Sequence, residues 1–127
     1  MKLTDIQRVY FIGIGGIGMS ALARYFKLLD KEVSGYDKTE TPLTIELTEL
    51  GISIHYEDKL SNISESFKDP ENTLVIYTPA VPNTHRQLNY FKETGFNIFK
   101  RSEVLGLITR DTFCFAVAGT HGKTTTS

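Results

Sequence analysis

Short apolar runs alternate along the chain with longer stretches in which apolar residues recur at helical spacing. Runs rich in β-branched and aromatic residues occupy positions 8–14, 32–36, 52–55, 73–77, 97–100 and 112–118. Short runs of this kind, bounded by turn residues, predict strands. Strands that alternate with amphipathic helices indicate an α/β fold, in which a Rossmann-like parallel sheet carries helices on both faces.

Helical spacing is clearest over residues 16–29, directly after the first predicted strand. A helix that packs on a sheet buries one apolar stripe and leaves its other side in water. The stripe is predicted to consist of Ile17, Ala21, Leu22, Tyr25, Leu28 and Leu29. These residues should therefore cover one face of the sheet.

Three further helices are predicted at residues 43–50, 83–94 and 102–110. Thr84 and Gln87 have the spacing of a capping box for the second of them, and Ser102 is the expected N-cap of the last. The polar stretch 57–72 should be a loop with a short helical turn around 63–67.

Composition excludes several function classes. The chain has 127 residues, of which 40% are hydrophobic and 23% charged, with a formal net charge of -1. This is enough for one domain, or one domain and a fragment, and it argues against disorder and against a polyanion-binding surface. No apolar run approaches the ~20 residues of a membrane span, so a soluble cytoplasmic protein is expected, with no nucleic acid or membrane as partner. Cys114, between two phenylalanines, is expected to be a buried, inert thiol.

A glycine-rich turn joins the first strand to the first helix. Gly13, Gly15 and Gly18 satisfy the pattern G-x-G-x-x-G. Glycines there let a pyrophosphate approach backbone N–H groups and the positive end of a helix, although a merely tight turn would also explain them. Asp37 follows the second strand, where a Rossmann-type site places an acidic group for ribose or base contacts. Its alternative role is to form and cap the local turn. This half of the sequence alone would indicate NAD binding.

A second phosphate-binding motif follows the last predicted strand, in the sequence GTHGKTT at 119–125. Such a loop wraps phosphates with backbone N–H groups, while Lys123 would pair with outer phosphate oxygens and Thr124 would reach Mg²⁺. The strict P-loop pattern requires glycine where this chain has Val117, and an unstructured tail is the alternative. A dehydrogenase has no need of this second loop.

Five motifs together resemble the Mur ligases of bacterial peptidoglycan synthesis, in the alanine-adding branch. They are GIGGIGMS at 13–20, GYD at 35–37, YTPAVP at 77–82, KRSEVLG at 100–106 and AVAGTHGKTTTS at 116–127. Related ligases share the shifted glycine of the GT-x-GKT loop, which accounts for Val117. Family members are much longer, so the resemblance implies a UDP-sugar-binding domain at 1–110 and the start of an ATP-binding domain at 111–127.

The resemblance implies an ATP-dependent ligase that joins L-alanine to UDP-N-acetylmuramate through an acyl phosphate. Its implied UDP-sugar contacts are Gly15, Gly16, Ile17, Gly18, Met19, Ser20, Asp37, His55, Thr78 and Ala80. Its implied ATP contacts are Gly119, Thr120, His121, Gly122, Lys123, Thr124 and Thr125, with Lys123 catalytic and Thr124 on Mg²⁺. This length of chain alone is expected to be inactive, to hold neither ATP nor Mg²⁺, and to dimerise, if at all, through the strand at 112–118.

Several side chains have two interpretations. His55 could lie against the uracil or be satisfied by backbone, and His121 could neighbour phosphate or only shape its loop. His85 is expected to be a solvated residue of a first helical turn. Arg101 could brace a domain boundary or reach a substrate phosphate. No three His, Cys, Asp or Glu residues have metal-ligand spacing, so no structural zinc is predicted.

The sequence leaves two other function classes open. One is the NAD-binding domain of an oxidoreductase, which Gly13, Gly15, Gly18 and Asp37 support and the lysine loop opposes. The other is a nucleotide-sensing module without catalysis.

Overall fold

The computed structural model describes residues 5–82 and 84–108. Within these residues, five parallel strands form one sheet in the order β3-β2-β1-β4-β5. They are β1 (Arg8–Ile12), β2 (Glu32–Tyr36), β3 (Ser53–His55), β4 (Thr73–Tyr77) and β5 (Asn97–Lys100). The predicted Rossmann-like α/β fold is confirmed. The predicted strand at 112–118 and the lysine loop at 119–125, with Cys114, His121, Lys123 and Thr124, lie outside the described residues.

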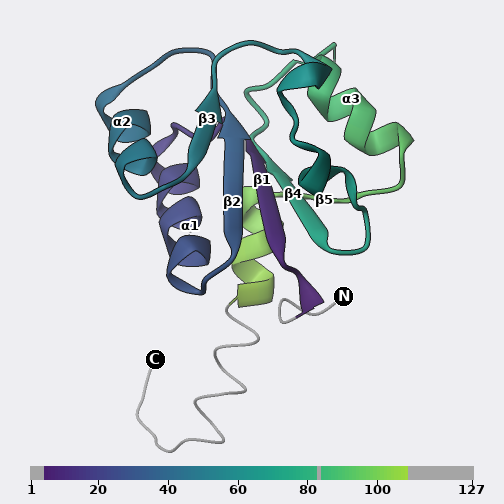
Figure 1. Ribbon diagram of the computed structural model, residues 1–127, viewed down its shortest axis with the longest axis horizontal. Coiled ribbons are helices and arrows are strands. Elements are labelled where there is room, and N and C mark those ends of the chain that lie inside the picture. Colours follow the sequence, from purple (N-terminus) through teal and green to yellow (C-terminus); the bar gives the residue numbers. More distant parts are fainter. Residues whose placement is uncertain (1–4, 83, 109–127) are drawn as a thin grey trace, which may run out of the picture.

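Helices cover both faces of the sheet (Figure 1). They are α1 (Ile17–Leu28), α2 (Pro42–Glu49) and α3 (Arg86–Glu93), with the 3-10 turns η2 (Leu60–Asn62) and η3 (Glu65–Lys68) in the crossover from β3 to β4. Residues 101–108 are also helical. The strand order reverses between β1 and β4, and at this point of an open parallel sheet ligands bind beyond the carboxyl ends of the strands.

Alternate residues of the strands enter two separate cores. Val9 and Phe11 of β1 pack in the core that also contains Phe26 of α1 and Val104. Tyr10 and Ile12 point the other way, into a core with Phe91 of α3. The period of two along β1 thus builds one core beneath α1 and another beneath α3.

The buried stripe of α1 differs from the predicted one. Ile17 and Leu28 are 84% and 83% exposed, and Ala21 and Leu29 are exposed as well. The buried residues are instead Met19, Ser20, Leu22, Ala23 and Phe26. Both stripes have helical spacing and share Leu22, and the observed one places Phe26 against Phe11 of β1, with ring centroids 6.3 Å apart.

Two predicted caps are also wrong. Gln87 does not close a capping box with Thr84, because its side chain bonds Tyr10 and the carbonyl of Lys59. Ser102 is not an N-cap, because the helix already includes residue 101. The backbone N–H of Lys100 donates instead to Glu103 Oε1 at 2.8 Å.

Candidate functional site

The glycine-rich turn lies at the carboxyl end of β1, in the centre of the sheet. Gly13 has φ of +93°, and the N–H groups of Gly13 and Ile14 both donate to the carbonyl of Tyr36 at 2.8 and 3.0 Å. A Cβ on Gly13 would overlap the Thr78 methyl group. Glycine is required there both for the backbone conformation and for the close approach of the loop after β4.

The glycine-rich turn leads directly into α1. Gly16 is the N-cap of α1, and within the described residues no side chain caps this helix. Its first turn also lacks an acidic residue. The first N–H groups of a helix have no partner within the helix and carry its positive dipole end. The start of α1 therefore offers donors to an anion.

Asp37 lies beside this turn, at the end of β2. Its Oδ2 accepts a hydrogen bond from the Gly15 N–H at 2.5 Å, and its Oδ1 accepts one from the Lys38 N–H at 2.6 Å. The carboxylate therefore both shapes its own turn and reaches the glycine-rich turn. His55 ends β3 in register with Tyr36, and its carbonyl accepts from the Asp37 N–H at 3.0 Å.

The two later glycines of the turn face opposite charges. A Cβ on Gly15 would overlap the Asp37 carboxylate and lie 2.8 Å from Thr44 Cγ2. A Cβ on Gly18 would lie 2.8 Å from Arg101 Nη1. By contrast, a Cβ on Gly16 would meet nothing closer than 3.8 Å. Glycine at 15 and 18 thus brings a carboxylate and a guanidinium against the turn.

The predicted site residues reach this edge in different ways. Ile17 is exposed at the start of α1, whereas Met19 and Ser20 are buried, and Ser20 Oγ donates to the Ile17 carbonyl at 3.0 Å. Met19 and Ser20 could therefore contribute backbone rather than side chains. The Thr78 N–H donates to the Ile12 carbonyl at 3.3 Å, which places this residue beside the turn, and Ala80 is exposed in the loop that follows.

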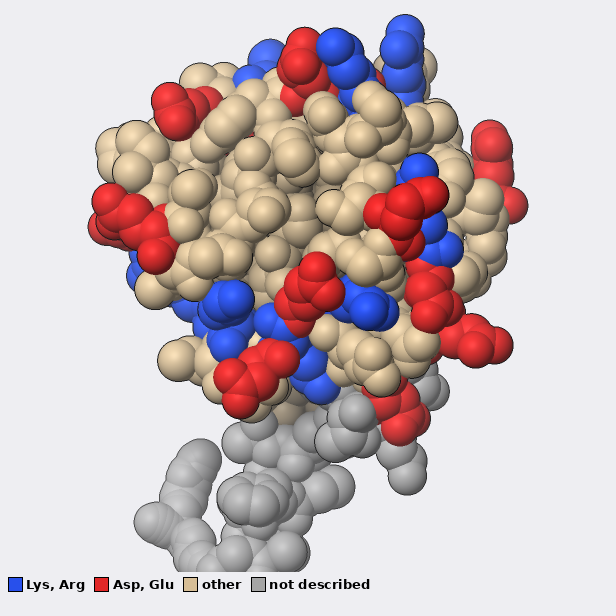
Figure 2. Space-filling view, viewed as in Figure 1, with Lys and Arg blue, Asp and Glu red and all other residues tan. Residues whose placement is uncertain are grey.

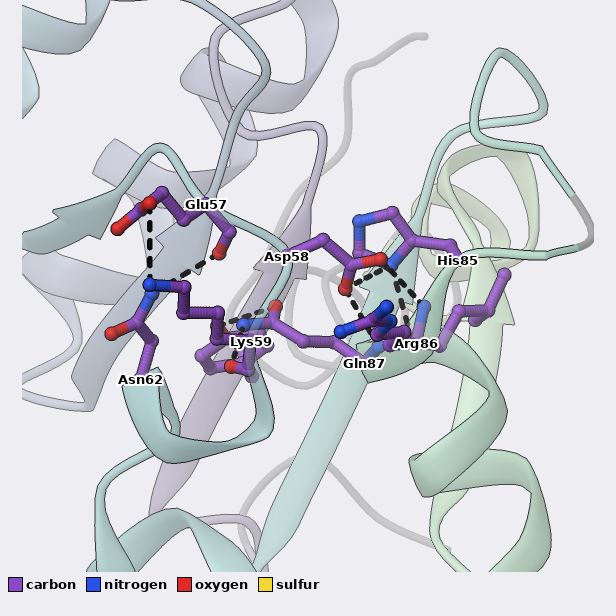
Figure 3. Close-up of polar contacts among 9 residues, drawn as sticks. Glu57, Asp58, Lys59, Asn62, His85, Arg86 and Gln87 are labelled. Carbon is purple, nitrogen blue, oxygen red and sulfur yellow. Dashed lines mark hydrogen bonds and ion pairs between the residues drawn. The ribbon is translucent and has the colours of Figure 1, made fainter.

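A polar network that sequence reasoning missed closes the start of α3 (Figure 3). The Asp58 carboxylate accepts from the N–H groups of Arg86 and Gln87 at 2.7 and 2.9 Å. His85 Nδ1 accepts from the Leu88 N–H at 3.3 Å. Tyr10 Oη donates to Gln87 Oε1 at 2.8 Å. The partners are separated in sequence by up to 77 residues, so no local pattern signals them.

His85 is not the solvated residue that was predicted. It is 5% exposed, and burial lowers its pKa although the nearby Asp58 carboxylate opposes this. Its ring meets Tyr36 edge-on at 4.6 Å between centroids. The side chain is therefore a neutral, buried N-cap of α3.

Surface charge does not suggest a polyanion partner. In Figure 2, acidic and basic side chains are interspersed on the face that is shown, without an extended basic patch. Among the residues that the structure describes, no three His, Cys, Asp or Glu side chains could hold a metal ion. None of the described helices is long and apolar enough to cross a membrane.

Comparison with known proteins decides the family. Residues 8–112 match the Mur ligase family, catalytic domain. The chain belongs to the Mur ligase family. It is 65% identical over its 127 residues to UDP-N-acetylmuramate–L-alanine ligase of Flavobacterium psychrophilum, and 56% identical to that of Phocaeicola vulgatus. The chain spans 28% of the length of these relatives.

A solved structure agrees with this membership in the Mur ligase family. The crystal structure of UDP-N-acetylmuramate-alanine ligase from Thermotoga maritima is similar with a TM-score of 0.70 at 34% identity. The match covers 84% of this chain and 22% of that chain. The resemblance inferred from the five motifs is thereby confirmed at the level of the family.

Proposed function

We propose that this chain is the UDP-N-acetylmuramate-binding part of an ATP-dependent ligase that adds L-alanine to that sugar nucleotide. The observation that carries the proposal is the uncapped, glycine-lined start of α1 at the switch point of the sheet, in a Mur ligase family chain. A diphosphate can accept hydrogen bonds from backbone N–H groups there without meeting a side chain.

The other predicted contacts can be arranged around that diphosphate. Backbone groups of Gly15, Gly16, Ile17 and Gly18 would bind the phosphates, with Met19 and Ser20 contributing only backbone. On the β2 and β3 side, Asp37 and His55 would contact the uridine, since both follow strands that end at this edge. Across β1, the loop with Thr78 and Ala80 would form the opposite wall. For the ligand to use the Gly15 N–H, the Asp37 carboxylate must release it.

Ligase activity is proposed for a longer protein that carries this sequence. A carboxylate is a poor acyl donor because oxide leaves badly. Attack of the lactyl carboxylate on the γ-phosphate of ATP would give an acyl phosphate and ADP, and the amine of L-alanine would then displace inorganic phosphate to form the amide. Residues 1–110 would hold the sugar nucleotide, and 111–127 would begin the ATP-binding part.

Within that second part, the lysine loop would position ATP. Its residues are Gly119, Thr120, His121, Gly122, Lys123, Thr124 and Thr125. Lys123 would neutralise charge on the transferred phosphoryl group, and Thr124 would ligate Mg²⁺. These roles rest on the family's motif. The bacterial cytoplasm, where ATP and sugar nucleotides are available, is the location that this activity requires.

A calorimetric titration of the 127-residue chain with UDP-N-acetylmuramate and with NADH tests the proposal. We expect saturable binding of the sugar nucleotide, competition by UDP, and no binding of NADH. Binding of NADH in preference to UDP would instead support the dinucleotide-binding oxidoreductase, which membership in the Mur ligase family already disfavours. Binding of neither would contradict both.

A further inference from the structure

Arg101 lies against the first turn of α1. It is the first residue of the helix that follows β5, and its guanidinium reaches Gly18, whose missing Cβ would lie 2.8 Å from Nη1, 2.9 Å from Cδ and 3.0 Å from Cζ. The Lys100 N–H bonded to Glu103 Oε1 holds the tight passage from strand to helix that directs Arg101 there. Within residues 5–82 and 84–108, no acidic side chain forms an ion pair with Arg101, which is exposed.

The glycine-rich turn therefore has opposite charges at its two ends. At Gly15 the Asp37 carboxylate already accepts the backbone N–H. At Gly18 the guanidinium presents N–H donors in the planar arrangement that matches phosphate oxygens. Because a carboxylate repels phosphate and a guanidinium attracts it, a nucleoside diphosphate has one favoured direction on this turn. Its nucleoside belongs on the Asp37 side and its outer phosphate on the Arg101 side.

We propose that Arg101 binds the phosphate distal to the nucleoside and thereby sets the direction in which a nucleoside diphosphate lies across α1. This inference rests on the proposed function, since it assigns a further contact of the same site. It also decides between the two roles that the sequence left open for Arg101, in favour of substrate phosphate. The sugar attached to the distal phosphate would then leave the turn beside the end of β5.

The test compares UDP, UMP and uridine in calorimetric titrations of the 127-residue chain and three variants. Arg101→Gln removes the charge at an exposed helical position, and Arg101→Lys keeps the charge without the planar fork. Arg86→Gln is the matched control, since Arg86 is also exposed and also begins a helix, but one on the opposite face of the sheet. Thermal unfolding of each variant accompanies the titrations.

Arg101→Gln should lower UDP affinity by roughly 10- to 100-fold, the loss typical of one charge-assisted contact, and bring it close to that of UMP. Uridine affinity should not change. Arg101→Lys should lie between the wild type and Arg101→Gln, and Arg86→Gln should match the wild type.

Unchanged UDP affinity in Arg101→Gln, and with it an unchanged ratio of UDP to UMP affinity, would overturn this inference while the proposed function stands. Equal losses for UMP and UDP would overturn the assignment to the distal phosphate. Failure of the wild-type chain to bind UDP would instead overturn the proposed function, and the role of Arg101 with it. If Arg101→Gln does not fold, the same ratio measured for Arg101→Lys decides the matter.

Discussion

Helices α1 and α3 both begin at the carboxyl edge of this sheet, but side chains cap the first N–H groups of α3 and not those of α1. At α3, Asp58 accepts from Arg86 and Gln87, and His85 accepts from Leu88, so the protein satisfies its own donors. At α1 the N-cap is Gly16, and no described side chain takes that place. Glycine in place of a capping side chain costs a helix only about a few tenths of a kcal/mol, so the open start of α1 sacrifices little stability. What it keeps is a set of donors for a ligand.

The largest expected effect is the loss of UDP affinity when a side chain fills the open space at the start of α1. Gly15→Val would put its side chain into the Asp37 carboxylate and Thr44, and into the space of a bound phosphate. UDP affinity should fall by about 100-fold or more, since at least two charge-assisted hydrogen bonds would be lost. Gly16→Ala is the control, because its Cβ meets nothing closer than 3.8 Å. Calorimetry on both folded variants measures these affinities, and equal UDP binding by Gly15→Val and Gly16→Ala would show that the diphosphate does not lie at this turn.

Removing hydrogen bonds from the polar network at the start of α3 should destabilise the fold without changing UDP affinity. Gln87→Ala leaves the buried Tyr10 hydroxyl without its acceptor and the Lys59 carbonyl without its donor. The free energy of unfolding should fall by about 2–3 kcal/mol, the cost of leaving buried polar groups unsatisfied. Gln7→Ala, at an exposed position, should change it little. Chemical denaturation measures both, and equal stability of the two variants would show that the network adds nothing.

Removing only the cap of α3 should have a smaller effect. Asp58→Ala deprives the N–H groups of Arg86 and Gln87 of their acceptor, and should cost about 1–2 kcal/mol. Amide exchange in α3 should quicken while UDP affinity stays unchanged. Asp5→Ala, a matched exposed aspartate, should alter neither. Weaker UDP binding in Asp58→Ala would mean that the two helix starts are coupled rather than separate.

The smallest expected effect is the part of the pH dependence of stability that comes from His85. Burial lowers the pKa of His85 below its ordinary value, so on acidification the unfolded chain takes up this proton before the folded chain does. The contribution to stability is thus complete above the ordinary histidine pKa and is lost as the pH falls toward the folded value. His85→Asn keeps an acceptor for the Leu88 N–H but cannot titrate in this range. Unfolding measured between pH 7.5 and 5.5 should show a shallower loss of stability in the variant; the same slope in both proteins would exclude His85 as the cause.

The sequence predicted the strands better than the helix caps. The runs at 32–36, 73–77 and 97–100 coincide with β2, β4 and β5, because continuous runs of strand-forming residues are a local signal. The strand predicted at 8–14 stops at Ile12, since Gly13 adopts positive φ. Periodicity identified α1 but not which of its two apolar stripes is buried. That choice depends on the sheet beneath it.

In the candidate site too, local features could be predicted from the sequence, and contacts between distant segments could not. Glycine spacing predicted the turn, and the distance to the end of the second strand placed Asp37 beside it, as the structure has them. The position of Arg101 could not be predicted, because it depends on the helix after β5 returning to the face of α1. The Asp58 cap lies 27 residues before His85, and contacts of this kind arise only when the crossover is folded.

Amide chemical shifts measured during a titration with UDP-N-acetylmuramate report which backbone N–H groups bind the diphosphate. We expect the largest changes at the N–H groups of Gly15, Gly16, Ile17 and Gly18, with a smaller change at Asp37 as its carboxylate releases Gly15. The N–H groups of Arg86 and Gln87 at the capped start of α3 should not move. Changes concentrated at α3, or none at the start of α1 under saturating ligand, would contradict the claim that α1 was left open for a diphosphate.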